Sequence, residues 1–187
     1  MIRAVLFDLD GTLADTALDL AGALNRLRAE HRMAPLPPER TRAHTSGGAR
    51  GLLKVGFDLE PGDERYVAMR DRFLDLYAEA LCVHTQLYAG MAELLGELDR
   101  RTVAWGIVTN KPRRFTDPLL HAAGVMRIAP QACLYVGDDL RDVQGARAAG
   151  MPVIAAGWGY LGEGGDPASW GADAVVAHPA EVLGFLD

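Results

Sequence analysis

The chain has 187 residues, of which 49% are hydrophobic and 24% are charged, and its formal net charge at pH 7 is -6. This length suits one α/β domain with a small insert, and it is sufficient to bury a hydrophobic core. The acidic balance, together with the lack of any basic stretch, argues against nucleic acid or an anionic membrane as a partner.

The N-terminal sequence predicts neither a secretory leader nor a membrane-spanning segment. The apolar start is interrupted at Asp8, and no run approaches the roughly 18 apolar residues of a membrane helix. The two cysteines, Cys82 and Cys133, cannot make a disulfide scaffold. We therefore expect a cytoplasmic protein, and a monomer or a dimer.

Short apolar runs alternate with amphipathic segments along most of the chain. The apolar runs predict strands over residues 4–7, 103–108, 132–136, 153–156 and 174–176. Helices are predicted over 91–98, 115–123 and 143–149, with another at the C-terminus. Alternating strands and helices predict an α/β fold with a doubly wound, Rossmann-like parallel sheet.

Residues 15–85 interrupt this alternation and predict a small helical cap inserted after the first strand. One helix starts at Asp15 or Thr16, and the prolines of 35–38 are expected to stop it. A glycine-rich turn is predicted over 46–51, and a second helix over 66–81. The core is then made of residues 1–14 and 86–187.

Three of the predicted strands end in polar clusters, at the sheet edge where α/β proteins bind ligands. Asp8 and Asp10 follow the first strand, Thr109 and Asn110 follow the second, and an acidic loop over 137–142 follows the third. Each cluster alone could be a turn or a helix cap. Together they place carboxylates at one edge, where like charges need a shared cation, and oxygen ligands suit Mg²⁺.

The same residues resemble a known family. The segments Asp8-Leu9-Asp10-Gly11-Thr12, Thr109-Asn110 and 137–142 resemble motifs I, II and IV of the haloacid dehalogenase-like hydrolases, and residues 15–85 resemble the family's α-helical cap. Residues 10–16, 108–112 and 136–138 are similar to the phosphoglycolate phosphatase group. Within it, residues 46–50 and 170–173 resemble the bacterial N-acetylmuramic acid 6-phosphate phosphatases.

The resemblance implies a Mg²⁺-dependent phosphatase that works in two steps. Asp8 would attack phosphorus and form an aspartyl-phosphate, and Asp10 would protonate the leaving alkoxide and then deprotonate water. Because a halide leaves without a proton, Asp10 favours phosphate esters over halides. The remaining implied roles are Mg²⁺ ligands (Asp8, the Asp10 carbonyl and Asp138), a residue that orients metal-bound water (Asp142), and phosphate-binding residues (Thr109, Asn110 and Lys111).

The cap is expected to select the substrate. Gly47 and Gly48 would let the backbone approach a ligand, and Arg50 would pair with a carboxylate of a small phosphorylated sugar acid or hydroxy acid. N-acetylmuramic acid 6-phosphate and 2-phosphoglycolate both carry one. In the alternative interpretation, residues 46–51 merely join two helices and Arg50 is solvated. A sugar phosphomutase with the same intermediate is a further alternative.

One family motif has no counterpart in this sequence. A lysine before a proline-containing helix is expected between motifs II and IV, yet Lys111 is the only lysine there and Lys54 is the only other in the chain. About 30 residues, the size of one βα unit, are lacking. Three explanations are open: a segment left out of the sequence, which we favour; a true deletion that leaves a catalytically impaired phosphate-binding protein; or a transfer of the charge to Lys111.

Overall fold

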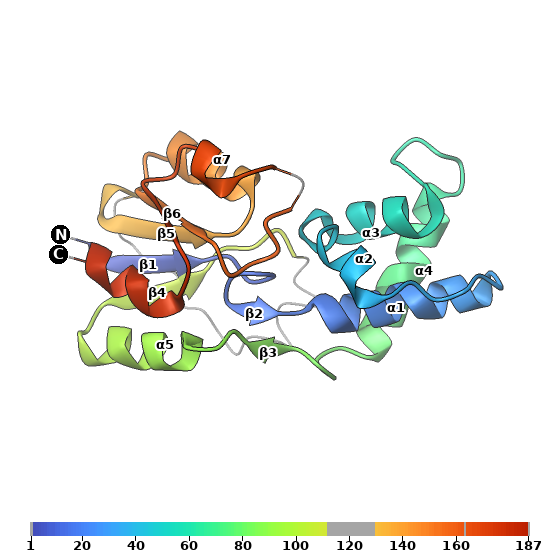
Figure 1. The fold of residues 1–187 in the computed structure, drawn as a ribbon, viewed down its shortest axis with the longest axis horizontal. Helices are drawn as coiled ribbons and strands as arrows, with labels where there is room; N and C mark the ends of the chain where they lie inside the picture. Colours follow the sequence, from blue (N-terminus) through green and yellow to red (C-terminus); the bar gives the residue numbers. More distant parts are fainter. Residues whose placement is uncertain (1, 112–129, 163, 187) are drawn as a thin grey trace.

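A parallel five-stranded sheet forms the core of the protein. The computed structural model describes residues 2–111, 130–162 and 164–186. Within them the strand order is β4-β1-β5-β6-β7 (Figure 1). The strands are β1 (Ala4–Phe7), β4 (Ala104–Ile107), β5 (Cys133–Gly137), β6 (Val153–Ala156) and β7 (Ala174–Val176). The predicted α/β fold is therefore confirmed, and each strand starts and ends within one residue of its predicted bounds.

The two faces of the sheet bury alternate residues of each strand. Along β5, Leu134 and Val136 belong to one hydrophobic cluster, and Tyr135 belongs to the other. Helix α5 (Met91–Arg100) and the 3-10 helix η4 (Pro179–Phe185) pack on one face, and helix α7 (Leu140–Ala148) packs on the opposite face (Figure 1). Every residue of β5 and β6 is buried, as expected for strands covered on both sides.

The predicted C-terminal helix is present as the 3-10 helix η4. The helix predicted over 115–123 lies outside the described residues. In the part of the chain that the structure describes, no helix combines the length and the apolar surface needed to cross a membrane.

Four α-helices and a short 3-10 helix, η1 (Thr45–Gly47), form a separate lobe at one end of the sheet (Figure 1). The α-helices are α1 (Ala17–Glu30), α2 (Pro38–Arg42), α3 (Gly48–Phe57) and α4 (Tyr66–Glu79). The lobe has its own hydrophobic cluster, in which Leu24, Phe73 and Tyr77 are almost fully buried. The chain enters and leaves this lobe through an antiparallel pair, β2 (Ala14–Asp15) and β3 (Gln86–Leu87). These separate clusters support our proposed division into a core of 1–14 and 86–187 and a cap of 15–85.

Two predicted details of the cap are wrong. The prolines do not end the first helix: α1 already ends at Glu30, and Pro38 instead begins α2, where its missing N–H costs nothing. The glycine-rich segment is not a turn throughout, because α3 begins at Gly48, which has a φ of 57°. Gly51 is helical and packs so closely that a Cβ there would lie 2.3 Å from the carbonyl oxygen of His44.

Candidate active site

The first pair of carboxylates follows β1 directly. Asp8 continues the sheet, because its backbone amide donates a 2.9 Å hydrogen bond to the carbonyl oxygen of Val136. The chain then turns at Gly11, whose φ is 92°. A Cβ at this position would lie 2.3 Å from Oδ2 of Asp138. Only glycine therefore lets the loop after β1 close on the carboxylate that follows β5.

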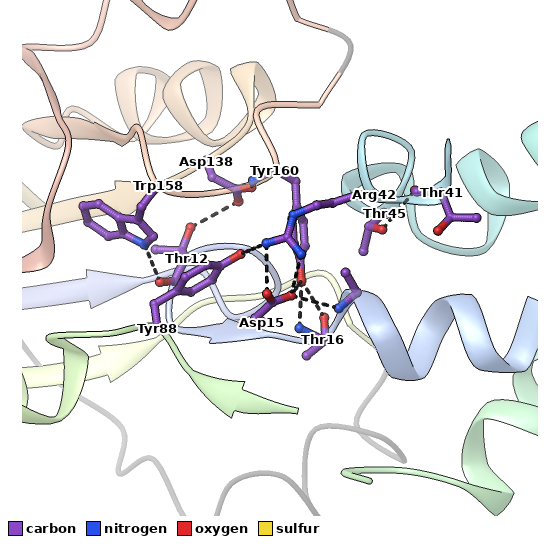
Figure 2. Close-up of polar contacts among 11 residues, drawn as sticks. Thr12, Asp15, Thr16, Thr41, Arg42, Thr45, Tyr88, Asp138, Trp158 and Tyr160 are labelled. Atoms are coloured by element: carbon purple, nitrogen blue, oxygen red, sulfur yellow. Dashed lines mark hydrogen bonds and ion pairs between the residues drawn. The ribbon is translucent and has the colours of Figure 1, made fainter. Parts of the chain in front are cut away.

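Asp138 is the deepest carboxylate of the site, with 1% of its surface exposed. The hydroxyl of Thr12 donates a 3.2 Å hydrogen bond to Oδ1, and the backbone amide of Tyr160 donates a 2.7 Å hydrogen bond to Oδ2 (Figure 2). Trp158 ties the two loops together, because its indole N–H donates to the carbonyl oxygen of Thr12 over 2.9 Å. Each oxygen of Asp138 thus accepts one hydrogen bond, Oδ1 from the loop after β1 and Oδ2 from the loop after β6.

The acidic loop after β5 is also the start of helix α7. Asp139 is the N-cap, and its side chain accepts a 2.9 Å hydrogen bond from the backbone amide of Arg141. Asp142 completes a capping box by accepting a 3.0 Å hydrogen bond from the amide of Asp139. The Tyr135 hydroxyl donates to the other oxygen of Asp142 over 3.3 Å. The helix cap therefore fixes the Asp142 carboxylate beside Asp138.

Three of these carboxylates converge. One oxygen from each of Asp8, Asp138 and Asp142 lies within 4.8 Å of the other two. Burial raises the pKa of Asp8 to about 8, and the negative charges of Asp142 and Asp138 add to this effect. Burial likewise raises the pKa of Asp138 to about 7, and it also raises the pKa of Asp142. Buried like charges in an all-oxygen set are the environment that a hard divalent cation such as Mg²⁺ stabilises, so these residues fit that ion.

The end of β4 lies beside the end of β1, because the amide of Val108 donates to the carbonyl oxygen of Phe7 over 2.9 Å. The three residues that follow, Thr109, Asn110 and Lys111, all line the same cavity as Asp8. The Thr109 hydroxyl oxygen accepts a 3.2 Å hydrogen bond from the amide of Lys111. Motif II residues thus lie at the same edge of the sheet as the nucleophile candidate and line the same cavity, as the polar clusters at the strand ends predict.

Lys111, which the sequence predicts to bind phosphate, forms an ion pair with Asp10 in this structure. Its ammonium nitrogen lies 2.8 Å from Oδ1 and 3.2 Å from Oδ2 of Asp10. The same nitrogen lies 4.7 Å from the centre of the Tyr77 ring on helix α4. Lys111 is therefore in direct contact with both the core and the cap.

The cavity between core and cap has a volume of about 340 Å³. The core side carries the carboxylates and motif II, and the cap side carries Gly47 and Gly48 together with an apolar wall. That wall is made of Leu20, Ala49, Phe73, Leu74 and Tyr77. Arg70 of α4 also lines this cavity. The cavity therefore has one acidic side, one apolar side and an additional cation.

Arg50 lies elsewhere. It is exposed and lines a neighbouring cavity of about 430 Å³, together with His44 and Lys54. Gly47, Asp139 and Arg141 line both cavities, so the two adjoin each other. The structure thus brings the two predicted glycines to the cavity of Asp8, and places Arg50 in the adjoining one.

Sequence reasoning missed several residues of the site. Thr12 and Thr16 belong to the motif around Asp10, but nothing in the motif says that their hydroxyls bond to Asp138 and Asp10. Tyr160 reaches Asp138 from another strand end, and no spacing in the sequence signals this contact. Arg70 lies within a helix that the sequence predicts, and only the packing of α4 shows that it faces the cavity.

Known proteins resemble this chain over almost its whole length. A family model described as haloacid dehalogenase-like hydrolase matches residues 5–129, and a second, described as HAD-hydrolase-like, matches residues 108–178. The N-acetylmuramic acid 6-phosphate phosphatase of Pseudomonas putida is 35% identical, over 100% of this chain and 96% of the relative. The phosphoglycolate phosphatase of Xanthomonas campestris is 36% identical, over 96% of this chain and 94% of the relative.

The alignment with the Pseudomonas putida enzyme extends over 215 positions, although this chain has 187 residues, so the relative has residues without a counterpart here.

Solved structures share the fold. A haloacid dehalogenase-like family hydrolase from Streptococcus pneumoniae gives a TM-score of 0.76 at 22% identity, over 100% of this chain and 99% of the other. CbbY of Rhodobacter sphaeroides in complex with phosphate gives a TM-score of 0.72 at 19% identity, over 97% of this chain and 96% of the other. The chain therefore belongs to the haloacid dehalogenase-like hydrolases and, among them, to the phosphatases.

Proposed function

We propose that this phosphatase is Mg²⁺-dependent, forms an aspartyl-phosphate on Asp8, and hydrolyses N-acetylmuramic acid 6-phosphate as part of cell-wall recycling. The observation that carries the proposal is the convergence of Asp8, Asp138 and Asp142 at one wall of the cavity, with motif II at the same edge. A cytoplasmic location, a monomeric or dimeric state, and the lack of nucleic-acid and membrane partners stay predictions.

In the proposed mechanism each residue has a separate task. Asp8 attacks the phosphorus atom, while Asp10 gives a proton to the leaving oxygen and later takes one from water. Thr109 and the backbone amide of Asn110 hold oxygens of the phosphoryl group. Thr109 and Asn110 lie at the cavity wall, as this task requires.

The metal would be held by Asp8, the backbone carbonyl of Asp10 and Asp138. Asp142, fixed by the capping box, would orient a water molecule of that ion. When bound, Mg²⁺ offsets negative charge on the transferring phosphoryl group. The raised pKa values of Asp8 and Asp138 support this assignment, because they mark carboxylates that are buried and have acidic neighbours, the setting in which a bound cation lowers the cost of the charged form.

The lining of the cap side favours the larger of the two candidate substrates. The apolar wall and the adjoining second cavity offer surface to a sugar ring, an acetyl group and a lactyl group, whereas glycolate has only two carbons to fill them. Arg70 lines the first cavity and Arg50 the second, so both are candidates to pair with a carboxylate, and Arg70 would exchange its present 2.8 Å bond to Asp71 for one to the substrate. The relatives named N-acetylmuramic acid 6-phosphate phosphatase agree with this choice, and those named phosphoglycolate phosphatase keep 2-phosphoglycolate as the alternative.

The test is Mg²⁺-dependent phosphate release from N-acetylmuramic acid 6-phosphate and from 2-phosphoglycolate, with Asp8→Asn as the blank. Protein whose intact mass matches the 20.1 kDa of this sequence should be used, so that a longer chain is not assayed by mistake. We expect release that Asp8→Asn abolishes and that is faster from the sugar acid. Phosphate binding without release would instead favour the catalytically impaired alternative.

Arginine variants locate the carboxylate of the substrate. Arg70→Met and Arg50→Met remove one candidate each, and Arg72→Met on the same helix as Arg70 is the control, since Arg72 pairs with Glu30 at the surface. The variant that lacks the true partner should raise KM for the sugar acid by on the order of 10-fold to 100-fold, the usual effect of one charged hydrogen bond. Equal KM values in all three variants would exclude both arginines.

A further inference from the structure

Lys111 and Asp10 form a partly buried ion pair at the edge of the proposed active site. The Lys111 side chain is 6% exposed and that of Asp10 is 20% exposed. Both oxygens of Asp10 lie within hydrogen-bonding distance of the Lys111 ammonium, at 2.8 and 3.2 Å. A lysine that is needed only to attract phosphate would not have to be aimed at the carboxylate of another residue.

Asp10 receives a second side-chain hydrogen bond, from a residue only six positions further along the chain. The hydroxyl of Thr16 donates to Oδ1 of Asp10 over 2.5 Å, and Thr16 is fully buried. Lys111 and Thr16 are both donors in these contacts, so Asp10 is held as an acceptor. Two donors on one carboxylate also fix its rotation, which sets the direction from which it can accept a further proton.

The cap contributes to this arrangement. The ring of Tyr77 on helix α4 lies 4.7 Å from the Lys111 ammonium, at a distance suited to a cation–π contact. Tyr77 is 1% exposed and belongs to the hydrophobic cluster of the cap. Lys111 therefore contacts Asp10 on the core and an aromatic face on the cap at the same time.

We propose that Lys111 is a positioning residue that holds Asp10 as the proton acceptor for breakdown of the aspartyl-phosphate, and that Tyr77 of the cap keeps Lys111 in place. The inference rests on the proposed function, because it concerns the second step of that reaction. In this step the oxygen of water bonds to phosphorus, the bond between phosphorus and Asp8 breaks, and one water proton passes to Asp10. Asp8 regains its free carboxylate and phosphate is the product.

This role makes a different prediction from that of a phosphate-binding lysine. Loss of a phosphate-binding group weakens capture of the substrate, so kcat/KM falls. With a leaving group that departs without a proton, loss of a residue that positions the proton acceptor slows only the second step, so kcat falls, KM falls with it, and the phosphorylated enzyme accumulates. The two roles are therefore separable without knowledge of the physiological substrate.

The experiment uses p-nitrophenyl phosphate, whose leaving group departs without a proton, so that the first step does not depend on Asp10. For Lys111→Met we expect kcat to fall by on the order of 10²-fold, the usual contribution of a positioned acid or base. We expect kcat/KM to fall far less, and a burst of p-nitrophenol before the steady state. Acid-quenched protein should then show a larger fraction with one added phosphoryl group than the wild type does, by intact mass.

Two further variants complete the test. Tyr77→Leu retains the lysine but removes the aromatic face, and it should show the same split between kcat and kcat/KM with a smaller amplitude. Arg100→Met removes an exposed cation of α5, and it should match the wild type. Equal losses of kcat and kcat/KM in Lys111→Met, with no accumulated phosphoenzyme, would overturn the inference. Failure of the wild type to release any p-nitrophenol with Mg²⁺ would instead count against the proposed function.

Discussion

The backbone amide of Tyr160 donates a 2.7 Å hydrogen bond to Oδ2 of Asp138, and so joins the loop after β6 to the deepest carboxylate of the site. The residue before it, Gly159, allows this approach. A Cβ at Gly159 would lie 2.2 Å from Cβ of Asp138 and 2.4 Å from the carbonyl oxygen of Gly11. The pocket around Asp138 is thus shaped by close backbone contacts between three loops.

Gly159→Ala should therefore weaken the proposed Mg²⁺ site as well as the fold. The new methyl group meets backbone and a fixed carboxylate, so we expect a loss of about 1–3 kcal/mol in the free energy of unfolding and a lower Mg²⁺ affinity. Denaturant unfolding and calorimetric Mg²⁺ titration measure the two effects. Gly22→Ala is the matched control: it lies on helix α1 with nothing within 4 Å of the added Cβ, and it should stabilise the protein by about 0.4–1 kcal/mol. An unchanged Mg²⁺ affinity in Gly159→Ala would contradict this account.

The raised pKa values of the acidic cluster predict how stability depends on pH. Asp8 and Asp138 have pKa values of about 8 and about 7 in the folded protein, against an ordinary value of 3.8. The unfolded chain loses these protons first, at about pH 4, so the folded state binds more protons across the interval up to about pH 8. The stabilisation that these protons provide is complete at acid pH, and it is lost as the pH rises through the folded pKa values.

Thermal unfolding with a chelator should therefore show a Tm that falls between about pH 5 and pH 8, and excess Mg²⁺ should remove the fall. Asp138→Asn should reduce the slope in the chelator. Asp173→Asn is the control, because hydrogen bonds from Val153 and Arg147 outweigh the effect of burial and hold the pKa of Asp173 below its ordinary value. That variant should lower Tm equally at every pH in this interval. A flat Tm in the chelator would show that the cluster does not carry the expected excess protons.

Arg42 of the cap contacts strand β2 at the cap boundary and two tyrosines of the core. Arg42 of α2 donates to both oxygens of Asp15, at 2.9 and 3.3 Å, and also to the hydroxyl of Tyr88 at 3.3 Å (Figure 2). Its guanidinium lies 5.1 Å from the centre of the Tyr160 ring. The pair is partly exposed, so we expect Arg42→Met to cost less than about 1 kcal/mol of stability.

The same variant should affect catalysis more than stability. Without Arg42 the cap loses a fixed contact with β2, so we expect a higher KM for the sugar acid and faster amide hydrogen exchange in β2 and β3. Arg26→Met removes a cation that bonds within the cap, to Glu79 and the carbonyl of Leu76, and should leave the KM unchanged. A normal KM in Arg42→Met would mean that the cap is positioned by its other contacts.

The sheet could be predicted from sequence because its strands are buried on both faces and appear as short apolar runs. Asp8 and Asp138 could be predicted as neighbours for the same reason, since parallel strands bring their carboxyl ends to one edge. Helix α3 was missed because glycines mask its pattern, although Leu52 and Leu53 are fully buried. The hydrophobic pattern of such a glycine-rich segment does not show which side of the helix packs against the rest of the cap.

The partner of Lys111 could not be predicted either. The sequence placed this lysine beside Thr109 and Asn110, and that proximity favoured a phosphate-binding role. The structure brings Asp10 and Tyr77 to it from distant parts of the chain. Such a contact depends on how the cap docks on the core, and no periodicity or spacing in the sequence carries that information.

Thr16→Val tests whether Asp10 depends on its second donor. The hydroxyl of Thr16 bonds to Asp10 at 2.5 Å and lies 3.3 Å from the hydroxyl of Tyr160, and valine keeps the shape of the side chain while it removes both contacts. Thr41→Val is a matched change, because Thr41 is 1% exposed and its hydroxyl donates over 2.9 Å to the carbonyl of Pro38, away from the cavity. Both variants should lose about 0.5–1.5 kcal/mol of stability, the net worth of one hydrogen bond. Only Thr16→Val should also lower kcat, by on the order of 10-fold, because only its hydroxyl holds the group that exchanges protons with the substrate and with water. If the two variants lose stability alike and both keep full kcat, the hydrogen bond to Asp10 serves the fold alone.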